Sequence, residues 1–113
     1  MNQYNISEAE CSGKRFSIQV NGKEVARAFL YILSNDLHQE PFGLLEDVFV
    51  EKDFRHAGLG KEIVERIITF AKEYGCYKLI ATSRTERPKV HHLYLNLGFF
   101  EQGKEFRMNF KDE

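Results

Sequence analysis

The chain has 113 residues, of which 42% are hydrophobic and 29% are charged, and its net charge is −1. That length suits one domain, so we expect a single domain over residues 1–113. A net charge near zero gives no bulk electrostatic reason to bind nucleic acid or a membrane surface, and we expect neither partner.

The start of the chain lacks the basic and apolar regions of a signal peptide, and no apolar run approaches the length of a membrane span. Cys11 and Cys76 stand far apart and form no C-x-x-C pair. We therefore expect a cytoplasmic protein with two free thiols.

The first half of the chain predicts three strands. Residues 16–20 alternate apolar and polar side chains, and Asn21-Gly22 then signals a tight hairpin, because both positions tolerate a positive φ. Residues 24–33 return as a longer apolar strand, and residues 34–43 read as a loop. Residues 44–50 form the third strand, whose apolar character on both faces indicates a central position.

The second half predicts two helices with a strand between them. Apolar residues recur at helical spacing from Leu59 to Ala71, and Gly75 closes this helix. Residues 77–82 read as a buried strand, parallel to the third strand by right-handed crossover. We expect a second helix over 88–97, opened by proline, and strand structure over 98–110 with a turn at Gly103.

These elements predict an α/β protein with a mixed, mostly antiparallel sheet and a parallel strand–helix–strand core. At its strand-to-helix turn the chain reads Arg55-x-x-Gly58-x-Gly60. Amides without partners, the helix dipole and a mobile charge on Arg55 would make an anion cradle suited to a pyrophosphate. A tight turn that needs glycine for steric reasons alone is the alternative. The pattern fits neither the P-loop nor the dinucleotide fingerprint, which needs a glycine where Ile63 stands.

Two segments resemble the GCN5-related N-acetyltransferase (GNAT) family. Residues 48–75, VFVEKDFRHAGLGKEIVERIITFAKEYG, are similar to its acyl-CoA-binding segment, whose signature is Arg/Gln-x-x-Gly-x-Gly/Ala after a strand. Residues 90–100, VHHLYLNLGFF, resemble the family's later helix with its Tyr-x-x-x-Gly-Phe ending at Tyr94, Gly98 and Phe99. The resemblance covers roughly residues 16–110, and it implies an acyl-CoA N-acyltransferase-like fold in a compact member with a shortened N-terminus.

The resemblance also implies where acetyl-CoA binds. Val48, Phe49 and Val50 would offer backbone groups to the pantetheine arm, as a short added strand would. The residues that would hold the pyrophosphate through their backbone are Arg55, His56, Ala57, Gly58, Leu59, Gly60 and Lys61. Arg87 stands where the family usually has an asparagine before the second helix, and we count it with the cofactor-binding residues.

The implied reaction is transfer of an acetyl group from acetyl-CoA to a primary amine by direct attack. Tyr94 stands at the family's acid position, although a core tyrosine that only fills space is the alternative. Glu46 is the predicted base, directly or through water, because Asp47 is expected to share a packed face with Leu45 and Phe49. The sequence also resembles members that bind substrate through both acidic residues. A coenzyme A-binding module without transferase activity is the alternative function.

The remaining expectations concern the helix histidines, metals and the acceptor. His91 and His92 read as a solvated helix surface, although His91 shares a helix face with Arg87 and Tyr94. No histidine or cysteine spacing matches a metal site, so we expect no metal. The acceptor is a small-molecule or protein amine. The short stretch before residue 16 would leave the acceptor side open, or a second subunit would complete it in a homodimer.

Overall fold

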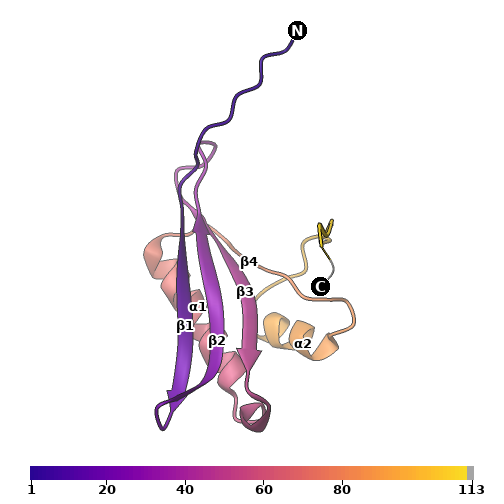
Figure 1. Ribbon diagram of the computed structural model, residues 1–113. Coiled ribbons are helices and arrows are strands. Elements are labelled where there is room, and N and C mark those ends of the chain that lie inside the picture. The colour runs from indigo at the N-terminus through magenta and orange to yellow at the C-terminus, as the bar shows by residue number, and fades with distance from the viewer. Residues whose placement is uncertain (112–113) are drawn as a thin grey trace. The chain divides into compact units, whose positions relative to one another are not determined.

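The computed structural model describes residues 1–111 and separates into two compact units, Met1–Ala81 and Thr82–Glu113 (Figure 1). The first unit contains a sheet and one long helix, and the second contains a short helix and the C-terminal segment. The single domain expected from the length stays a prediction. The elements in chain order are β1 Cys11–Val20, β2 Lys23–Leu33, β3 Phe42–Val50, the 3₁₀ helix η1 Lys52–Phe54, α1 Leu59–Tyr74, β4 Leu79–Ala81 and α2 Pro88–Asn96.

The sheet has four strands in the order β1-β2-β3-β4. The first three strands are antiparallel and β4 is parallel to β3, so the mixed α/β fold expected from the sequence is confirmed. The hairpin after β1 has positive φ at both turn residues, 52° at Asn21 and 78° at Gly22, as its sequence predicts.

Two strand lengths differ from the sequence prediction. β1 begins at Cys11 instead of residue 16, and its first residue pairs with Leu33 at the end of β2. β4 is confined to Leu79–Ala81, shorter than the expected 77–82. β1 extends back to Cys11 because β2 offers a partner as far as Leu33, and backbone pairing does not require the apolar alternation that marks a strand in sequence. β4 pairs only with Gly43–Leu45, although β3 continues to Val50.

Helix α1 covers one face of the sheet (Figure 1). Its apolar stripe is buried as expected, and Phe16 of β1 contacts Phe70 of α1 edge to face, with ring centroids 5.5 Å apart. Gly75 ends the helix at φ 102°, and Cys76 closes the turn by donating its amide to the Ala71 carbonyl. The buried core side chains are Val25, Ala26, Ala28, Leu30, Ile32, Leu45, Ile63, Val64, Ile67 and Ala71.

Strand β3 contains a β-bulge in its second half. Its register with β2 shifts between Arg27, which pairs with Phe49, and Phe29, which pairs with Glu46. The β3 segment between these pairs is one residue longer than the matching β2 segment, and Asp47 at the bulge has φ 50°. The bulge turns Phe49 onto the same face as Glu46, because the usual alternation of sides is interrupted between them.

The expected sharing of a packed face by Asp47, Leu45 and Phe49 is therefore wrong. Leu45 pairs with Leu30 and is buried in the core, whereas Asp47 is exposed and Phe49 is half-buried on the other face. An extra residue in one strand reverses the sides of all residues beyond it, and composition alone does not reveal it.

In the second unit, α2 begins at Pro88 as predicted and stops before Gly98, which has φ 101°. The strand expected over 98–110 is wrong, since residues 99–109 carry no regular secondary structure. Phe106, Met108 and Phe110 alternate as strand residues do, but they are exposed and no strand within residues 1–111 pairs with them. A strand needs a neighbour for its backbone groups, and the apolar alternation does not supply one.

Candidate functional site

The second half of β3 presents an open edge. β4 pairs with β3 only from Gly43 to Leu45. From Glu46 to Val50, β3 therefore has no strand on that side within residues 1–111. An open edge of this length offers backbone donors and acceptors to an extended ligand, which can add to the sheet as a short strand would.

The turn from β3 into α1 exposes a run of backbone amides. Gly58 is the N-cap of α1, and no side chain caps the helix there. The Glu62 amide donates to the Gly58 carbonyl at 3.1 Å, which begins the hydrogen bonding of the helix. Within the described chain, the amides of residues 58–61 donate to no protein acceptor. Such a helix start favours an anion through its donors and its dipole.

The two glycines of this turn have different physical roles. Gly58 has φ 76°, a left-handed conformation that side chains rarely adopt, so the backbone itself requires glycine. Gly60 has no positive φ, and a Cβ there would meet only the Val50 side chain at an ordinary 3.9 Å. The fold therefore does not require glycine at position 60. Space for a ligand that approaches the backbone closely would explain glycine at position 60. A tight turn that needs glycine for steric reasons alone would not explain it.

Arg55 is held by the end of β3. Its Nε donates to the Val50 carbonyl at 2.9 Å, and its guanidinium carbon lies 5.7 Å from the centre of the Phe49 ring. The mobility expected of the Arg55 charge stays a prediction. The side chain nevertheless remains exposed, so its other nitrogens can reach an anion beside the turn.

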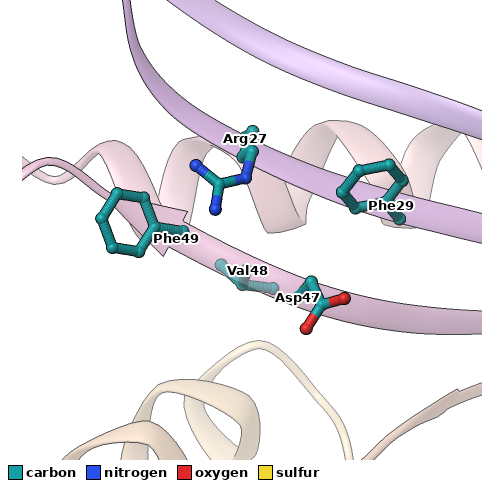
Figure 2. Close-up of a pocket in the computed structure, with 5 residues that line it drawn as sticks. All are labelled: Arg27, Phe29, Asp47, Val48 and Phe49. Atoms are coloured by element: carbon teal, nitrogen blue, oxygen red, sulfur yellow. The ribbon is translucent and has the colours of Figure 1, made fainter.

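A pocket of about 380 Å³ lies on the sheet face that α1 does not cover (Figure 2). Two aromatic rings and one charge of each sign contribute to it, and its lining residues are Arg27, Phe29, Asp47, Val48 and Phe49. Its volume is within the range of about 300–1,000 Å³ that is usual for small-molecule sites. The pocket adjoins the open β3 edge, because Val48 and Phe49 belong to both.

The pocket brings together residues that sequence reasoning found and residues that it missed. Asp47 and Phe49 were singled out from the sequence, whereas Arg27 and Phe29 were not. Both missed residues lie on β2, which the sequence predicts only as a longer apolar strand. The charge of Arg27 among apolar neighbours was the available signal, since a buried central strand rarely carries an arginine.

A second arginine on this face is already neutralised. Arg15 donates two hydrogen bonds to the Glu24 carboxylate, at 2.6 and 2.8 Å. These hydrogen bonds, and more weakly the charges of Arg15 and Arg27, hold the pKa of the Glu24 carboxyl below its usual value. Arg15 also stands over the Phe29 ring at 5.8 Å.

The second unit holds the other predicted site residues. Tyr94 is half-buried and its ring centroid lies 5.3 Å from that of Phe99. Arg87 is the exposed N-cap of α2 and its side chain makes no capping hydrogen bond. His92 is exposed as expected, but the solvated surface expected at His91 is wrong. His91 is half-buried, and its Nε2 lies 2.8 Å from the Arg84 carbonyl.

Within residues 1–111, no cluster of three histidine, cysteine or acidic side chains is arranged to hold a metal ion. No helix in that range is long and apolar enough to cross a membrane. Cys11 is exposed and Cys76 is half-buried, both as free thiols, and burial raises the pKa of the Cys76 thiol.

Comparison with known proteins gives consistent matches. Residues 2–99 match the profile of the acetyltransferase (GNAT) family. A glucosamine 6-phosphate N-acetyltransferase of Trypanosoma brucei brucei is 32% identical over 97 residues, which are 85% of this chain and 64% of that protein. An aminoglycoside N(6')-acetyltransferase type 1 of Acinetobacter genomosp. 13 is 27% identical over 71 residues, 63% of this chain and 49% of that protein.

A solved structure of similar fold agrees with these matches. The glucosamine-6-phosphate N-acetyltransferase from Arabidopsis thaliana superposes with a TM-score of 0.78 at 29% identity, covering 88% of this chain and 67% of that one. The chain thus spans about half to two thirds of the length of these relatives.

Proposed function

This chain belongs to the acetyltransferase (GNAT) family, and from that premise we propose that it transfers an acetyl group from acetyl-CoA to a primary amine. The observation that carries the proposal is the open edge of β3 beside the unpartnered amides at the start of α1. An extended pantetheine arm fits the open edge of β3, and a pyrophosphate fits the amides at the start of α1. The two features adjoin along the chain, as the two parts of coenzyme A adjoin.

In this proposal the cofactor is held mainly by backbone. Val48 to Val50 bind the pantetheine arm, and the turn from Arg55 to Lys61 binds the pyrophosphate. The Val50 carbonyl already accepts one hydrogen bond, from Arg55 Nε. Arg87, exposed and without a capping bond, is the proposed additional cation for the cofactor.

The proposed chemistry is direct acyl transfer. The amine nitrogen attacks the thioester carbonyl carbon, a C–N bond forms, and the C–S bond breaks with release of a thiolate. The proton lost by the amine goes to Glu46, directly or through water, and Tyr94 protonates the thiolate. A thiol of this kind has a pKa of about 8.5, so a positioned acid helps its departure.

Small amines are the proposed acceptors. The similar proteins are named for glucosamine 6-phosphate and for aminoglycosides, which are both amino sugars. The aromatic rings of Phe29 and Phe49 in the pocket suit the apolar face of a sugar, and Asp47 offers a carboxylate to its ammonium group.

Release of free thiol from acetyl-CoA tests the function. The chain is mixed with acetyl-CoA and, one at a time, glucosamine 6-phosphate, glucosamine, an aminoglycoside and a lysine peptide. Amine-dependent thiol release with formation of the N-acetyl product supports an enzyme. Tight coenzyme A binding with no product from any amine supports the binding-module alternative instead.

The choice of base is tested by comparing Glu46→Gln with Asp47→Asn. Both side chains lie in or next to the bulge, but Glu46 is half-buried while Asp47 is exposed in the pocket. We expect Glu46→Gln to abolish the part of the pH dependence of kcat that comes from ionisation of the general base. We expect Asp47→Asn to raise KM for the amine. The reverse assignment follows if only Asp47→Asn removes the pH dependence.

A further inference from the structure

The pocket keeps two opposite charges apart. Arg27 and Asp47 both line it, yet they form no ion pair, so their charged atoms lie farther apart than the 4.0 Å limit for one. Figure 2 shows the guanidinium of Arg27 directed toward Phe49, while the carboxylate of Asp47 lies farther along β3 in the direction of Phe29. A ligand that carries both charges can satisfy both groups at once.

The bulge and a ring contact determine where these two side chains lie. Asp47 belongs to the bulge and has φ 50°, and it lines the pocket together with Arg27. The guanidinium carbon of Arg27 lies 4.6 Å from the centre of the Phe49 ring. At this distance the guanidinium makes a cation–π contact with the ring, and its N–H donors have no acceptor in the described chain.

Arg15 provides the contrast on the same face. Its guanidinium donates to both oxygens of Glu24, so its charge and donors are already matched. Arg27 is half-buried, lines the pocket and has no such partner within residues 1–111. An arginine fork whose donors have no acceptor in the described chain is suited to bind a phosphate or carboxylate with two parallel hydrogen bonds.

We propose that Arg27 is a specificity-determining residue that selects acceptors carrying an anionic group in addition to the amine. This inference rests on the proposed function, because it assigns the pocket to the acceptor. The ammonium lies against Asp47, the anion lies against Arg27, and the rings of Phe29 and Phe49 contact the body of the molecule. Phosphorylated amino sugars have this chemistry.

The same arrangement disfavours polycationic acceptors. An aminoglycoside carries several ammonium groups, and one of them would have to approach the guanidinium of Arg27, which forms no ion pair in the described chain. Like charges at a partly desolvated site repel. The pocket offers a single lining carboxylate to offset this, that of Asp47.

Binding measured without catalysis tests the inference. The chain is titrated by calorimetry with glucosamine 6-phosphate, glucosamine and glucose 6-phosphate, each at the same salt concentration. We expect glucosamine 6-phosphate to bind roughly tenfold or more tightly than glucosamine, as a charge-assisted bidentate contact allows. Glucose 6-phosphate keeps the phosphate and lacks the amine, so its binding should depend on Arg27 and not on Asp47.

Variants separate the two arginines. Arg27→Gln should remove the preference for the phosphorylated sugar, measured as the ratio of the dissociation constants of glucosamine and glucosamine 6-phosphate, and Arg27→Lys should retain part of it. Arg15→Gln is the matched control and should leave the preference intact, because Arg15 is already paired with Glu24. Melting temperatures show that each variant is folded, and Arg27→Lys serves if Arg27→Gln is not.

The outcomes separate this inference from the proposed function. A phosphate preference that depends on Arg27, with no amine acetylated, supports recognition of the anionic group by Arg27 and overturns the proposed function. Acetylation of amines without any phosphate preference overturns the inference alone. A preference that survives Arg27→Gln, or that Arg15→Gln removes equally, also overturns it.

Discussion

At the residue scale, replacement by alanine should have opposite effects on stability at Gly58 and at Gly60. Gly60→Ala should slightly stabilise the fold, by up to about 1 kcal/mol, because alanine is a better helix former and no neighbour obstructs its Cβ. It should nevertheless weaken coenzyme A binding sharply, because the methyl group occupies the space left for the pyrophosphate.

Gly58→Ala is the matched control, measured by chemical denaturation and coenzyme A titration. The left-handed backbone at Gly58 should make that variant less stable by about 1 kcal/mol. Unchanged coenzyme A affinity in Gly60→Ala would contradict the cradle at this turn and leave glycine at position 60 without an explanation.

Tyr94 is tested by removing its hydroxyl and keeping its ring. Because the ring packs near Phe99, Tyr94→Phe should keep the melting temperature and the acetyl-CoA affinity close to their original values. If the hydroxyl protonates the departing thiolate, kcat should fall by about 10²–10⁴. Steady-state kinetics at saturating acetyl-CoA measure this, and near-normal turnover would show that Tyr94 only fills space.

At the element scale, the turn into α1 should respond to the cofactor as a unit. Coenzyme A should slow hydrogen exchange at the amides of residues 58–61, which have no protein acceptor within the described chain. Amides in the middle of β2 are paired on both sides and should not change. Exchange followed by mass spectrometry or NMR measures both segments, and equal protection of the two would indicate general stabilisation instead of a local site.

The bulge in β3 places Asp47 and Phe49 on the side of the sheet where the pocket lies. Without it, Asp47 would lie on the side of Leu45, beneath α1, and its carboxylate would be buried in the core. With it, Asp47 and Phe49 both line the pocket beside Arg27. The sequence contains both acidic residues but no sign of the extra residue, because a bulge depends on the register with the neighbouring strand.

At the scale of the whole molecule, stability depends on the core between the sheet and α1. Leu30 is fully buried there, so Leu30→Ala should reduce the free energy of unfolding by about 2–5 kcal/mol. Leu37 lies in the loop between β2 and β3 with 82% of its surface exposed, and Leu37→Ala should change that energy by less than about 0.5 kcal/mol. Urea denaturation compares the two variants, and equal effects would contradict the assignment of the core.

The sequence by itself determined the order and type of the main elements, the hairpin at Asn21-Gly22, the apolar stripe of α1 and the family. These features depend on local periodicity, on backbone preferences of single residues and on short spaced motifs, which are all readable along one chain.

Only the tertiary structure decided what depends on neighbours. The start of β1 at Cys11 and the irregular segment after Phe99 follow from which strands are available as partners, and β4 pairs only with Gly43–Leu45 of β3. The hydrogen bond from Arg55 to the end of β3 was not readable in the sequence, and the pocket that contains both Arg27 and Asp47 follows from the bulge and the β2–β3 register. Pairing and register join residues far apart in sequence, so no local pattern specifies them.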